Sequence, residues 1–354
     1  MSIIGEGKVF CKSLPCRFYT GPEYYAGLGT LLIIVAMAAL FNVFTAPFFF
    51  RQSFGGVLAA LIVVWLAQAI SIIALIMLLT TDPGIVPKSL YYRDQFDPVR
   101  GCLREKPPPA SFENSIRTFP IRSKYCETCG TVRAPRVVHC SSDDVDIEKF
   151  DHHCPWIGCC VAKRNYKIFL IFLLSLSLAC IGLIAISIAH LALHTLDDYS
   201  DSNSLAQSIR HSLAGNIPVA IVAGICIVFM WFIVGLTAYH IYLASHAMTT
   251  YEHIRGAFES IGNPYDKGPW YRNLLAVFKE PIRPSWVDLK NMTVRKIAKL
   301  ESELEPIPER RLASNTSDVL TTSFAQSSQR DVSTVIVASN REIHPSCHGE
   351  RTII

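Results

Sequence analysis

Charged residues are scarce in this sequence. Asp, Glu, Lys and Arg make up 18% of its 354 residues, and the net charge is only +4. No basic stripe with interleaved aromatic residues stands out, as it does in many proteins that bind nucleic acid. We therefore expect no nucleic-acid partner.

Other features are missing as well. Residues 1–20 lack the apolar core of a cleavable signal peptide, because charged residues and cysteines interrupt them. We find no internal repeat. Half of the residues are hydrophobic, and the mean hydropathy of +0.30 is high for a water-soluble protein. The composition therefore points to a membrane protein.

Four long runs of the chain contain no Asp, Glu, Lys or Arg. They extend approximately over 24–45, 54–79, 168–193 and 217–243. Each is as long as the roughly 20 apolar residues that a helix needs to cross a bilayer. Buried helices of a soluble protein are the alternative, but four runs of this length disfavour it. We predict an all-α membrane protein with transmembrane helices within 24–80 and 167–245.

Positive charge is distributed unequally between the segments that join these runs. Thirteen Lys and Arg residues lie between Thr80 and Asn165, whereas the two opposite connections contain only Arg51 and Arg210. The positive-inside rule therefore places the loop and both termini in the cytosol. The predicted cytosolic segments are an N-terminus over 1–23, a loop over 81–166, a C-terminal region over 246–295 and a tail over 296–354. The tail is rich in Ser and Thr, and we expect it to be disordered.

Cysteine is concentrated in the predicted cytosolic loop. Six of the 12 cysteines lie within one window at about 124–165, together with His139, His152 and His153. In a secreted domain this pattern would indicate disulfides, whereas on the cytosolic side it indicates metal ligands and a reactive thiol. The spacings are typical of tetrahedral zinc, and a segment with so little apolar core needs metal to fold. The alternative is that the cysteines pack as small hydrophobic residues.

Two closed zinc sites need eight ligands, and the Cys and His residues supply fewer if Cys154 is set aside. The obvious candidates are Cys126, Cys129, His139, Cys140, one of His152 and His153, and one of Cys159 and Cys160. Carboxylates also bind zinc, and three acids lie in the gap: Asp143, Asp144 and Asp146. Asp143 follows Cys140 at the C-x2-C offset. The alternative is that these three acids bind no metal and are solvated loop residues.

Cys154 follows two histidines directly. A cysteine thiol is a weak nucleophile at neutral pH unless a neighbouring histidine, itself held by a carboxylate, activates it. Asp151, His152 and Cys154 supply these three groups within four residues. In an extended strand His152 and Cys154 point to the same side and His153 to the other. One histidine can therefore face the thiol while the other faces a metal.

The window resembles the cysteine-rich zinc-finger domain of the DHHC-type protein S-acyltransferases, or palmitoyltransferases, which are multi-pass membrane enzymes. The resemblance covers most of residues 20–280. The motifs that carry it are TDPG at 81–84, YCETC at 125–129, RAPRVVHC at 133–140, FDHHCPWIG at 150–158, RNYKIF at 164–169, TTYE at 249–252 and NPYDKG at 263–268.

The resemblance implies a two-step palmitoylation reaction. Cys154 would take the acyl group from palmitoyl-CoA, and a membrane-proximal cysteine of a substrate protein would then accept it as a thioester. By the same resemblance, His152 is the general base, Asp151 orients it, and Thr250 binds that aspartate. The expected partners are acyl-CoA, substrate proteins and the lipid bilayer of the Golgi, endomembrane vesicles or the plasma membrane. The candidates to bind the CoA phosphates are four basic residues: Arg133, Arg136, Lys163 and Arg164.

The resemblance also assigns the zinc ligands. One site would use Cys126, Cys129, His139 and Asp146, and the other Cys140, Asp143, His153 and Cys160. The family has cysteine at both aspartate positions, so we predict two zinc ions bound with reduced affinity. The alternative is that one or both sites are under-occupied. A rival function is therefore a scaffold-type pseudoenzyme with weakened zinc sites, although the intact DHHC, TDPG and TTYE motifs favour an enzyme.

Overall fold

The computed structural model describes residues 8–10, 18–51, 55–88, 96–97, 102–103, 110–113, 118–121, 124–200, 204–282, 285, 287–288 and 293–294. The tail over 296–354 that we expect to be disordered lies outside these residues. The chain forms two compact units. The larger, over 1–93 and 107–294, contains every described helix. In the smaller unit, the described residues form one hairpin of β4 (Phe96–Asp97) and β5 (Cys102–Leu103).

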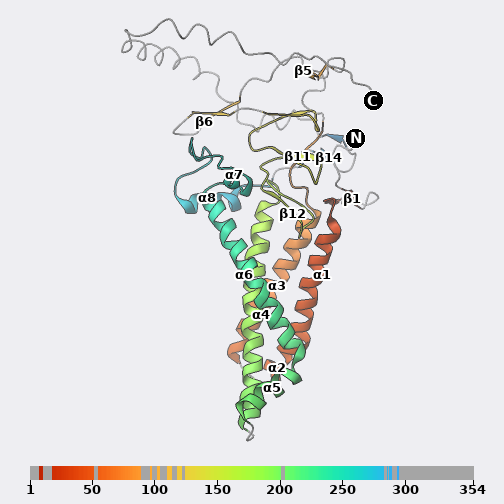
Figure 1. Cartoon of the computed structure of the whole chain (residues 1–354), viewed down its shortest axis with the longest axis vertical. Helices are drawn as coiled ribbons and strands as arrows, with labels where there is room; N and C mark the ends of the chain where they lie inside the picture. The colour runs from red at the N-terminus through yellow and green to blue at the C-terminus, as the bar shows by residue number, and fades with distance from the viewer. Residues whose placement is uncertain are drawn as a thin grey trace, which may run out of the picture. The chain divides into compact units, whose positions relative to one another are not determined.

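Four helical spans in the described residues are long and apolar enough to cross a membrane, which confirms the predicted fold class. The first consists of α1 (Tyr24–Leu40), the π-helical turn η1 (Phe41–Thr45) and α2 (Ala46–Arg51). The others are α3 (Gly55–Thr80), α4 (Tyr166–Ser200) and α6 (Ile217–Ser245). Helix α4 packs against both α3 and α6, and α1 packs against α3 (Figure 1).

The outer surfaces of these helices are apolar. Val228 and Trp231 on α6, for example, are 72% and 78% exposed. Water would be a poor solvent for so many exposed apolar side chains, whereas lipid tails are not. The protein is therefore a multi-pass membrane protein.

The connection between the third and fourth spans is more helical than the hydropathy pattern indicates. Helix α4 continues past residue 193 to Ser200, and α5 (Leu205–Gly215) fills most of the remaining connection. Ser204 and Gln207 begin α5 with a capping box, which satisfies backbone N–H groups at the start of the helix. The Ser212 hydroxyl donates to the Leu191 carbonyl at 2.9 Å and joins α5 to α4.

The cysteine-rich segment is built from short strands at one end of the bundle. Strands β10 (Val138–Cys140), β11 (Val145–Ile147) and β3 (Ile85–Val86) form one sheet. Strands β8 (Lys124–Cys126) and β9 (Thr131–Arg133) form one hairpin, and β12 (His152–Cys154) and β13 (Cys159–Val161) form another. Further hairpins pair β1 (Lys8–Phe10) with β2 (Phe18–Thr20), β6 (Ala110–Glu113) with β7 (Thr118–Ile121), and β14 (Val287–Asp288) with β15 (Thr293–Val294). The sequence predicted this segment and an extended strand at His152 to Cys154, which is β12, but not the other strands.

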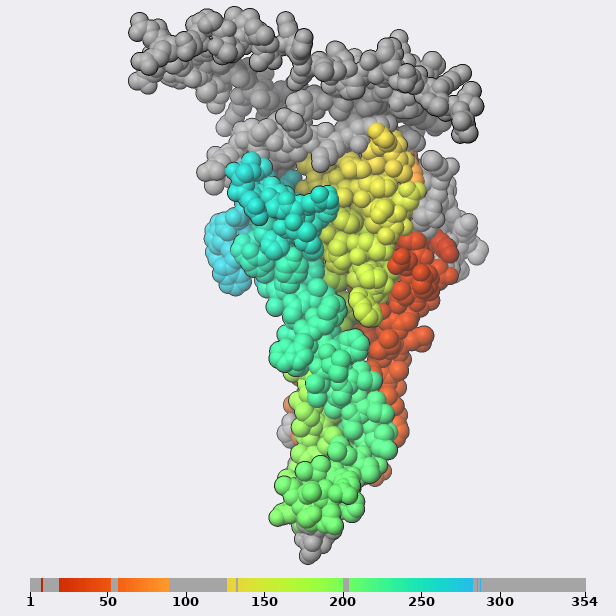
Figure 2. All heavy atoms as spheres, in the orientation of Figure 1, coloured from red at the N-terminus to blue at the C-terminus, as the bar shows by residue number. Residues whose placement is uncertain are grey.

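The turn after Cys154 packs directly on the start of α1. A Cβ at Gly158, whose φ is +72°, would lie 2.1 Å from the Glu23 carbonyl oxygen, so no larger residue fits there. The Thr30 hydroxyl donates to the Trp156 carbonyl at 2.8 Å. In Figure 2 the cysteine-rich segment, in yellow, borders the red start of α1 on one side and the blue-green C-terminal region on the other. The turn is thereby fixed to the membrane helices.

Two short helices follow the fourth span. Helix α7 (Thr250–Ile254) begins at the TTYE motif with a capping box between Thr249 and Glu252. Helix α8 (Trp270–Lys279) packs against α6 and α4. Both helices lie at the same end of the bundle as the cysteine-rich segment (Figure 1).

Candidate active site and metal centres

Strand β12 carries residues of the candidate active site and of a candidate metal centre. It pairs with β13 in the register His152↔Val161, His153↔Cys160 and Cys154↔Cys159. His152 contacts Asp151, whereas His153 contacts Cys140 and Cys160. The alternation expected for an extended strand therefore separates the two histidines.

Asp151 lies at the centre of a hydrogen-bond network. Its carboxylate is 2.6 Å from His152 Nδ1 and accepts hydrogen bonds from the Thr250 hydroxyl at 2.8 Å and the Thr250 N–H at 2.9 Å. Burial raises the pKa of Asp151. Its hydrogen bonds, above all the one with His152, lower the pKa by more than burial raises it, so the net pKa lies below the usual value. Asp151 is therefore a buried carboxylate anion that orients His152.

The imidazole of His152 lies between this anion and the Cys154 thiol. Burial lowers the pKa of His152, but the hydrogen bonds with Asp151 and Cys154 raise it, to about 9 overall. When Nδ1 donates to Asp151, Nε2 is left for proton exchange with another group.

His240 of α6 adds a second imidazole that the sequence analysis did not assign to the site. It is only 1% exposed, and its ring centre lies 5.7 Å from that of His152 and 4.9 Å from that of Phe169. The Tyr166 hydroxyl lies 3.4 Å from His240 Nδ1. The sequence offered one sign of a role for His240: an ionisable residue is rare within a membrane span.

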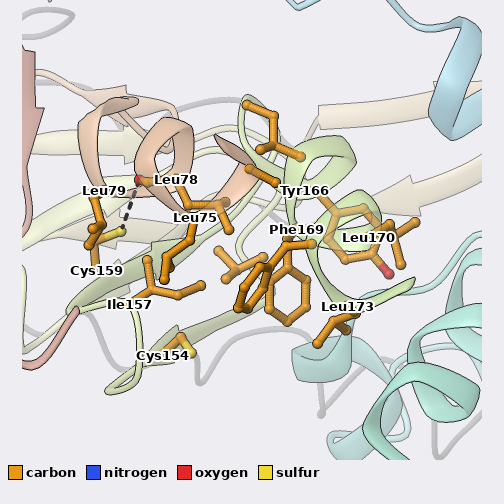
Figure 3. Packing of buried hydrophobic residues seen from close by; sticks show 14 of the residues in the cluster. Leu75, Leu78, Leu79, Cys154, Ile157, Cys159, Tyr166, Phe169, Leu170 and Leu173 are labelled. Atoms are coloured by element: carbon orange, nitrogen blue, oxygen red, sulfur yellow. Dashed lines mark hydrogen bonds between the residues drawn. The ribbon is translucent and has the colours of Figure 1, made fainter. Parts of the chain in front are cut away.

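Cys154 is 7% exposed and belongs to an apolar cluster with Leu75, Ile157 and Phe169 (Figure 3). It also lines a cavity of about 170 Å³ between the membrane helices. Along α4 the lining extends from Phe169 to Leu183, which at the helical rise corresponds to about 21 Å. That is roughly the length of an extended palmitoyl chain. The polar exceptions among the lining side chains are few: Thr30, Gln68 and Ser71.

The first metal-type cluster, called the Asp146 cluster here, consists of Cys126, Cys129, His139 and Asp146. His139 Nδ1 lies 3.7 Å from Cys126 Sγ, 3.4 Å from Cys129 Sγ and 3.5 Å from Asp146 Oδ1. Strands β8, β10 and β11 contribute ligand residues, and Cys129 lies in the turn between β8 and β9.

The second, called the Asp143 cluster, consists of Cys140, Asp143, His153 and Cys160. His153 Nδ1 lies 3.7 Å from both Sγ atoms and 3.4 Å from Asp143 Oδ1. The pKa of His153 is raised to about 10, mainly by Asp143 and then by Cys140. Hydrogen bonding with Cys160 lowers the pKa of Cys140 to about 5, which favours its thiolate form.

Both clusters fit zinc. Bonds of about 2.0–2.3 Å in a tetrahedron place neighbouring ligand atoms roughly 3.3–3.8 Å apart, and the distances around His139 and His153 agree with this spacing. Each group combines two thiols, an imidazole and a carboxylate, a donor set that suits zinc. The structure therefore brings together the two ligand sets that the resemblance implied.

The residues that the sequence left as alternatives lie outside these two clusters. Cys159 is buried and its Sγ is 3.9 Å from the Leu78 carbonyl oxygen, drawn as a dashed line in Figure 3. Burial raises the pKa of Cys159, so it stays a neutral thiol. Asp144 forms an ion pair with Lys88 at 2.5 Å.

Carboxylates already pair with all four basic residues considered for the CoA phosphates. Arg133 pairs with Asp146 and Lys163 with Glu148. The others form the pairs Arg136–Glu252 and Arg164–Asp82. Because these pairs use part of the hydrogen-bonding capacity, these residues are weaker phosphate ligands than the sequence suggests.

The Arg136–Glu252 pair holds the TTYE motif against the cysteine-rich segment. Arg136 donates to both carboxylate oxygens of Glu252, at 2.6 and 2.5 Å, and to the Ala247 carbonyl. Its guanidinium also lies over the Tyr265 ring at 4.0 Å. Thr250 lies 99 residues after Asp151 in the chain, and the Arg136–Glu252 contact holds it within hydrogen-bond distance of that aspartate.

An oriented imidazole beside a thiol that lines an apolar cavity is the arrangement expected of a membrane-bound enzyme that handles long acyl chains. Residues 120–257 match the DHHC palmitoyltransferase domain. Palmitoyltransferase ZDHHC18-B of Danio rerio is 34% identical over 277 residues, which cover 73% of this chain and 67% of the relative. Palmitoyltransferase ZDHHC18 of Homo sapiens is 34% identical over 289 residues, covering 77% and 71%. Palmitoyltransferase ZDHHC9 of Danio rerio is 33% identical over 283 residues, covering 74% and 68%.

The chain belongs to the DHHC palmitoyltransferase family. The prediction of a protein S-acyltransferase is thereby confirmed, and nothing in the described residues favours the scaffold alternative.

Proposed function

We propose that this protein transfers a palmitoyl group from palmitoyl-CoA to cysteine thiols of substrate proteins through an acyl-enzyme on Cys154. The observation that carries the proposal is the position of Cys154, which lies beside the Asp151–His152 pair and also lines the apolar cavity. A thiol at that junction can be activated on one side while the acyl tail occupies the other.

In the first step His152 holds the proton of the Cys154 thiol on Nε2, and the thiolate attacks the thioester carbonyl carbon of palmitoyl-CoA. The bond to the CoA sulfur breaks, and CoA leaves as a thiol with the proton from His152. In the second step His152 deprotonates the substrate cysteine, whose sulfur attacks the acyl carbonyl carbon. The bond from that carbon to the Cys154 sulfur breaks, and His152 returns the proton to Cys154. Each step exchanges one thioester for another, so positioning and thiolate formation account for most of the catalysis.

Asp151 and Thr250 are positioning residues in this scheme. Asp151 stabilises the imidazolium that forms when His152 takes a proton, and Thr250 fixes the carboxylate through two hydrogen bonds. The acyl tail would lie along α4 in the cavity that begins at Cys154. Burial of its methylene groups there supplies binding energy.

Zinc would occupy the Asp146 and Asp143 clusters, with Asp146 and Asp143 each supplying a carboxylate oxygen. When bound, the ions supply structural cross-links rather than acyl-transfer chemistry, since every ligand position is filled by protein. Cys160 and His153 would hold β13 and β12 together beside Cys154.

The proposed topology places this end of the bundle and both termini in the cytosol. It is supported by the thirteen basic residues between Thr80 and Asn165. Substrate cysteines near the cytosolic face of the Golgi, endomembrane vesicles or the plasma membrane would then reach Cys154, and acyl-CoA would enter from the same side.

Labelling with an alkyne analogue of palmitoyl-CoA tests the proposal. The purified wild-type chain, reconstituted with zinc, should acquire a hydroxylamine-sensitive label. Cys154→Ser should reduce the label to background, whereas Cys102→Ser, in the smaller unit, should keep it. Absence of the label from folded, zinc-loaded wild type would refute the acyl-enzyme and favour a scaffold role.

A further inference from the structure

The two metal-type clusters differ in how the protein holds their carboxylates. In the Asp146 cluster, Oδ2 of Asp146 accepts a hydrogen bond from the Thr131 hydroxyl at 2.6 Å. Oδ1, the oxygen nearest His139, accepts one from Arg133 Nε at 3.2 Å. Asp146 is fully buried, so these two donors and the arginine charge replace the water that the carboxylate has lost.

Asp143 is equally buried but has much weaker support. Oδ2 accepts one hydrogen bond, from the Cys160 N–H at 3.3 Å. Among the described residues, Oδ1 has no hydrogen-bond partner. It lies 3.4 Å from His153 Nδ1, which exceeds the usual 2.7–3.2 Å of an N–H···O bond but fits two ligands of one metal ion.

This difference in hydrogen-bond donors to the two carboxylates matters more for a cluster without zinc than for one with zinc bound. A carboxylate oxygen has two lone pairs, so Asp146 can bind a metal and keep its bonds to Thr131 and Arg133. The same bonds stabilise its carboxylate when no metal is bound. Asp143 has no hydroxyl or arginine donor among the described residues. In an empty cluster its carboxylate would keep only the Cys160 N–H and the His153 imidazole at 3.4 Å, beyond the usual hydrogen-bond distance.

The Arg133 cation also acts against zinc directly. It lies 3.2 Å from the oxygen that would ligate the ion and beside Cys126, a second ligand. Two positive charges this close repel each other in a poorly hydrated site. The orientation of Asp146 by Thr131 favours metal binding, but Thr131 orients the carboxylate equally in the empty cluster.

We propose that the two clusters are not equivalent: the Asp143 cluster requires zinc to stay folded, whereas Arg133 substitutes for zinc in the Asp146 cluster. This inference rests on the zinc assignment of the proposed function, not on the acyl transfer. The protein would then work with one zinc ion held firmly and a second that exchanges readily.

The positions of the clusters suit this division. The Asp143 cluster ties together β10, β12 and β13, and its ligand His153 directly precedes Cys154. The Asp146 cluster has no ligand in β12 or β13. Loss of its zinc would therefore leave the strand of Cys154 in place.

A chelator titration of the full-length protein in detergent micelles tests the proposal. Zinc per chain is measured by elemental analysis after each addition of EDTA, together with the thermal unfolding midpoint. We expect one equivalent to leave first with little change in the midpoint. The second should leave only as the protein unfolds. Release of both equivalents in a single step would overturn the proposal.

Variants show which cluster releases its zinc early and which releases it late. Asp146→Cys restores a third thiolate and removes the Arg133 ion pair, so it should slow the early release. Asp143→Cys should leave the early release unchanged. If Asp143→Cys were the variant that slowed the early phase, the exchangeable zinc would belong to the Asp143 cluster and the proposal would be wrong.

Arg133→Gln isolates the role of the arginine. With two zinc ions bound it should unfold close to wild type, but with one ion it should unfold about 2–4 °C lower than one-zinc wild type. Arg133→Lys, which keeps the charge, should recover part of this difference. Arg272→Gln on α8 is the matched control and should show none. Equal midpoints for one-zinc Arg133→Gln and one-zinc wild type would contradict the proposal.

Acyl labelling of the same samples separates the two hypotheses. Two zinc phases without any Cys154 label would refute the acyl-transfer mechanism and leave the present inference intact. Normal labelling with a single zinc phase would do the reverse.

Discussion

The two sides of strand β12 differ in how closely they keep the family pattern. On one side Asp151, His152 and Cys154 are all present, with Thr250 bonded to Asp151. His153, on the other side, belongs to the Asp143 cluster. There, as in the Asp146 cluster, an aspartate takes a position at which the resemblance to the family led us to expect cysteine. The chemistry explains the difference: acyl transfer needs a thiol at one particular place, whereas a corner of a zinc tetrahedron accepts either sulfur or oxygen.

The two sides also depend on different contacts. The metal clusters are formed within one segment of the chain, from Cys126 to Cys160. The catalytic side is completed by α7, whose Thr250 reaches Asp151 because Arg136 binds Glu252. Damage to the metal side should therefore affect folding first, and damage to the catalytic side should affect the reaction first.

The largest effects should come from replacing the two histidines of β12 in turn. His152→Ala removes the base and should slow formation of the acyl-enzyme by about 10²- to 10⁴-fold while both zinc ions stay bound. His153→Ala removes a ligand of the Asp143 cluster and should lower both zinc content and the unfolding midpoint. Elemental analysis beside acyl labelling distinguishes them. Equal metal loss in both variants would contradict this division of roles.

The pH dependence of stability should come next. Folding raises the pKa of His152 from 6.5 to about 9, so its contribution is complete below pH 6.5 and is lost as the pH rises through about 9. The difference corresponds to roughly 3 kcal/mol. Asp151, whose pKa is lowered, keeps its contribution until the pH falls well into the acid range. Chemical unfolding of the zinc-loaded protein between pH 6 and 10 measures the loss.

His152→Gln is the control for that measurement, since it has no titrating group in this pH range. Its stability should depend much less on pH between about 7 and 9 than that of wild type. Identical slopes for the two proteins would assign the dependence to other groups.

Thr250→Val should have a smaller effect, confined to the catalytic side. It removes the hydroxyl that donates to Asp151 at 2.8 Å but keeps the side-chain shape and the backbone N–H bond. Loss of a hydrogen bond to a charged group costs about 1.5–3 kcal/mol, so single-turnover acylation should slow by roughly 10- to 100-fold. Zinc content should not change. Thr250→Ser should recover most of the rate, and a Val variant as fast as wild type would remove Thr250 from the mechanism.

The smallest effect should be on the choice of acyl chain. Ala179 lines the cavity, and Ala179→Phe would fill part of it and shift labelling towards shorter acyl-CoA analogues by several-fold. Leu178→Phe is the matched control, because Leu178 is 49% exposed and does not line the cavity. A shared shift in both variants would assign the effect to helix packing rather than to the cavity.

Much of the fold could be predicted because it depends on local composition. Long uncharged runs form membrane helices wherever they occur, and the spacing of Cys and His limits the possible metal sites. Helix α5 was missed because its polar sequence resembles a loop; the Ser204–Gln207 capping box was its available signal. His240 was missed because no motif links it to the DHHC segment, 86 positions earlier at Cys154.

The resemblance to the family implied that aspartate stands at two expected zinc-ligand positions. The sequence alone determined that the chain lies in a membrane and that it carries an Asp-His-x-Cys group. These properties follow from residue types and short spacings, which remain the same in any conformation. Only the tertiary structure decided which partners those groups have. Thr250 reaches Asp151, and Arg133 reaches Asp146 but not Asp143. Side-chain contacts of this kind depend on how the strands and helices pack, so residue spacing alone does not specify them.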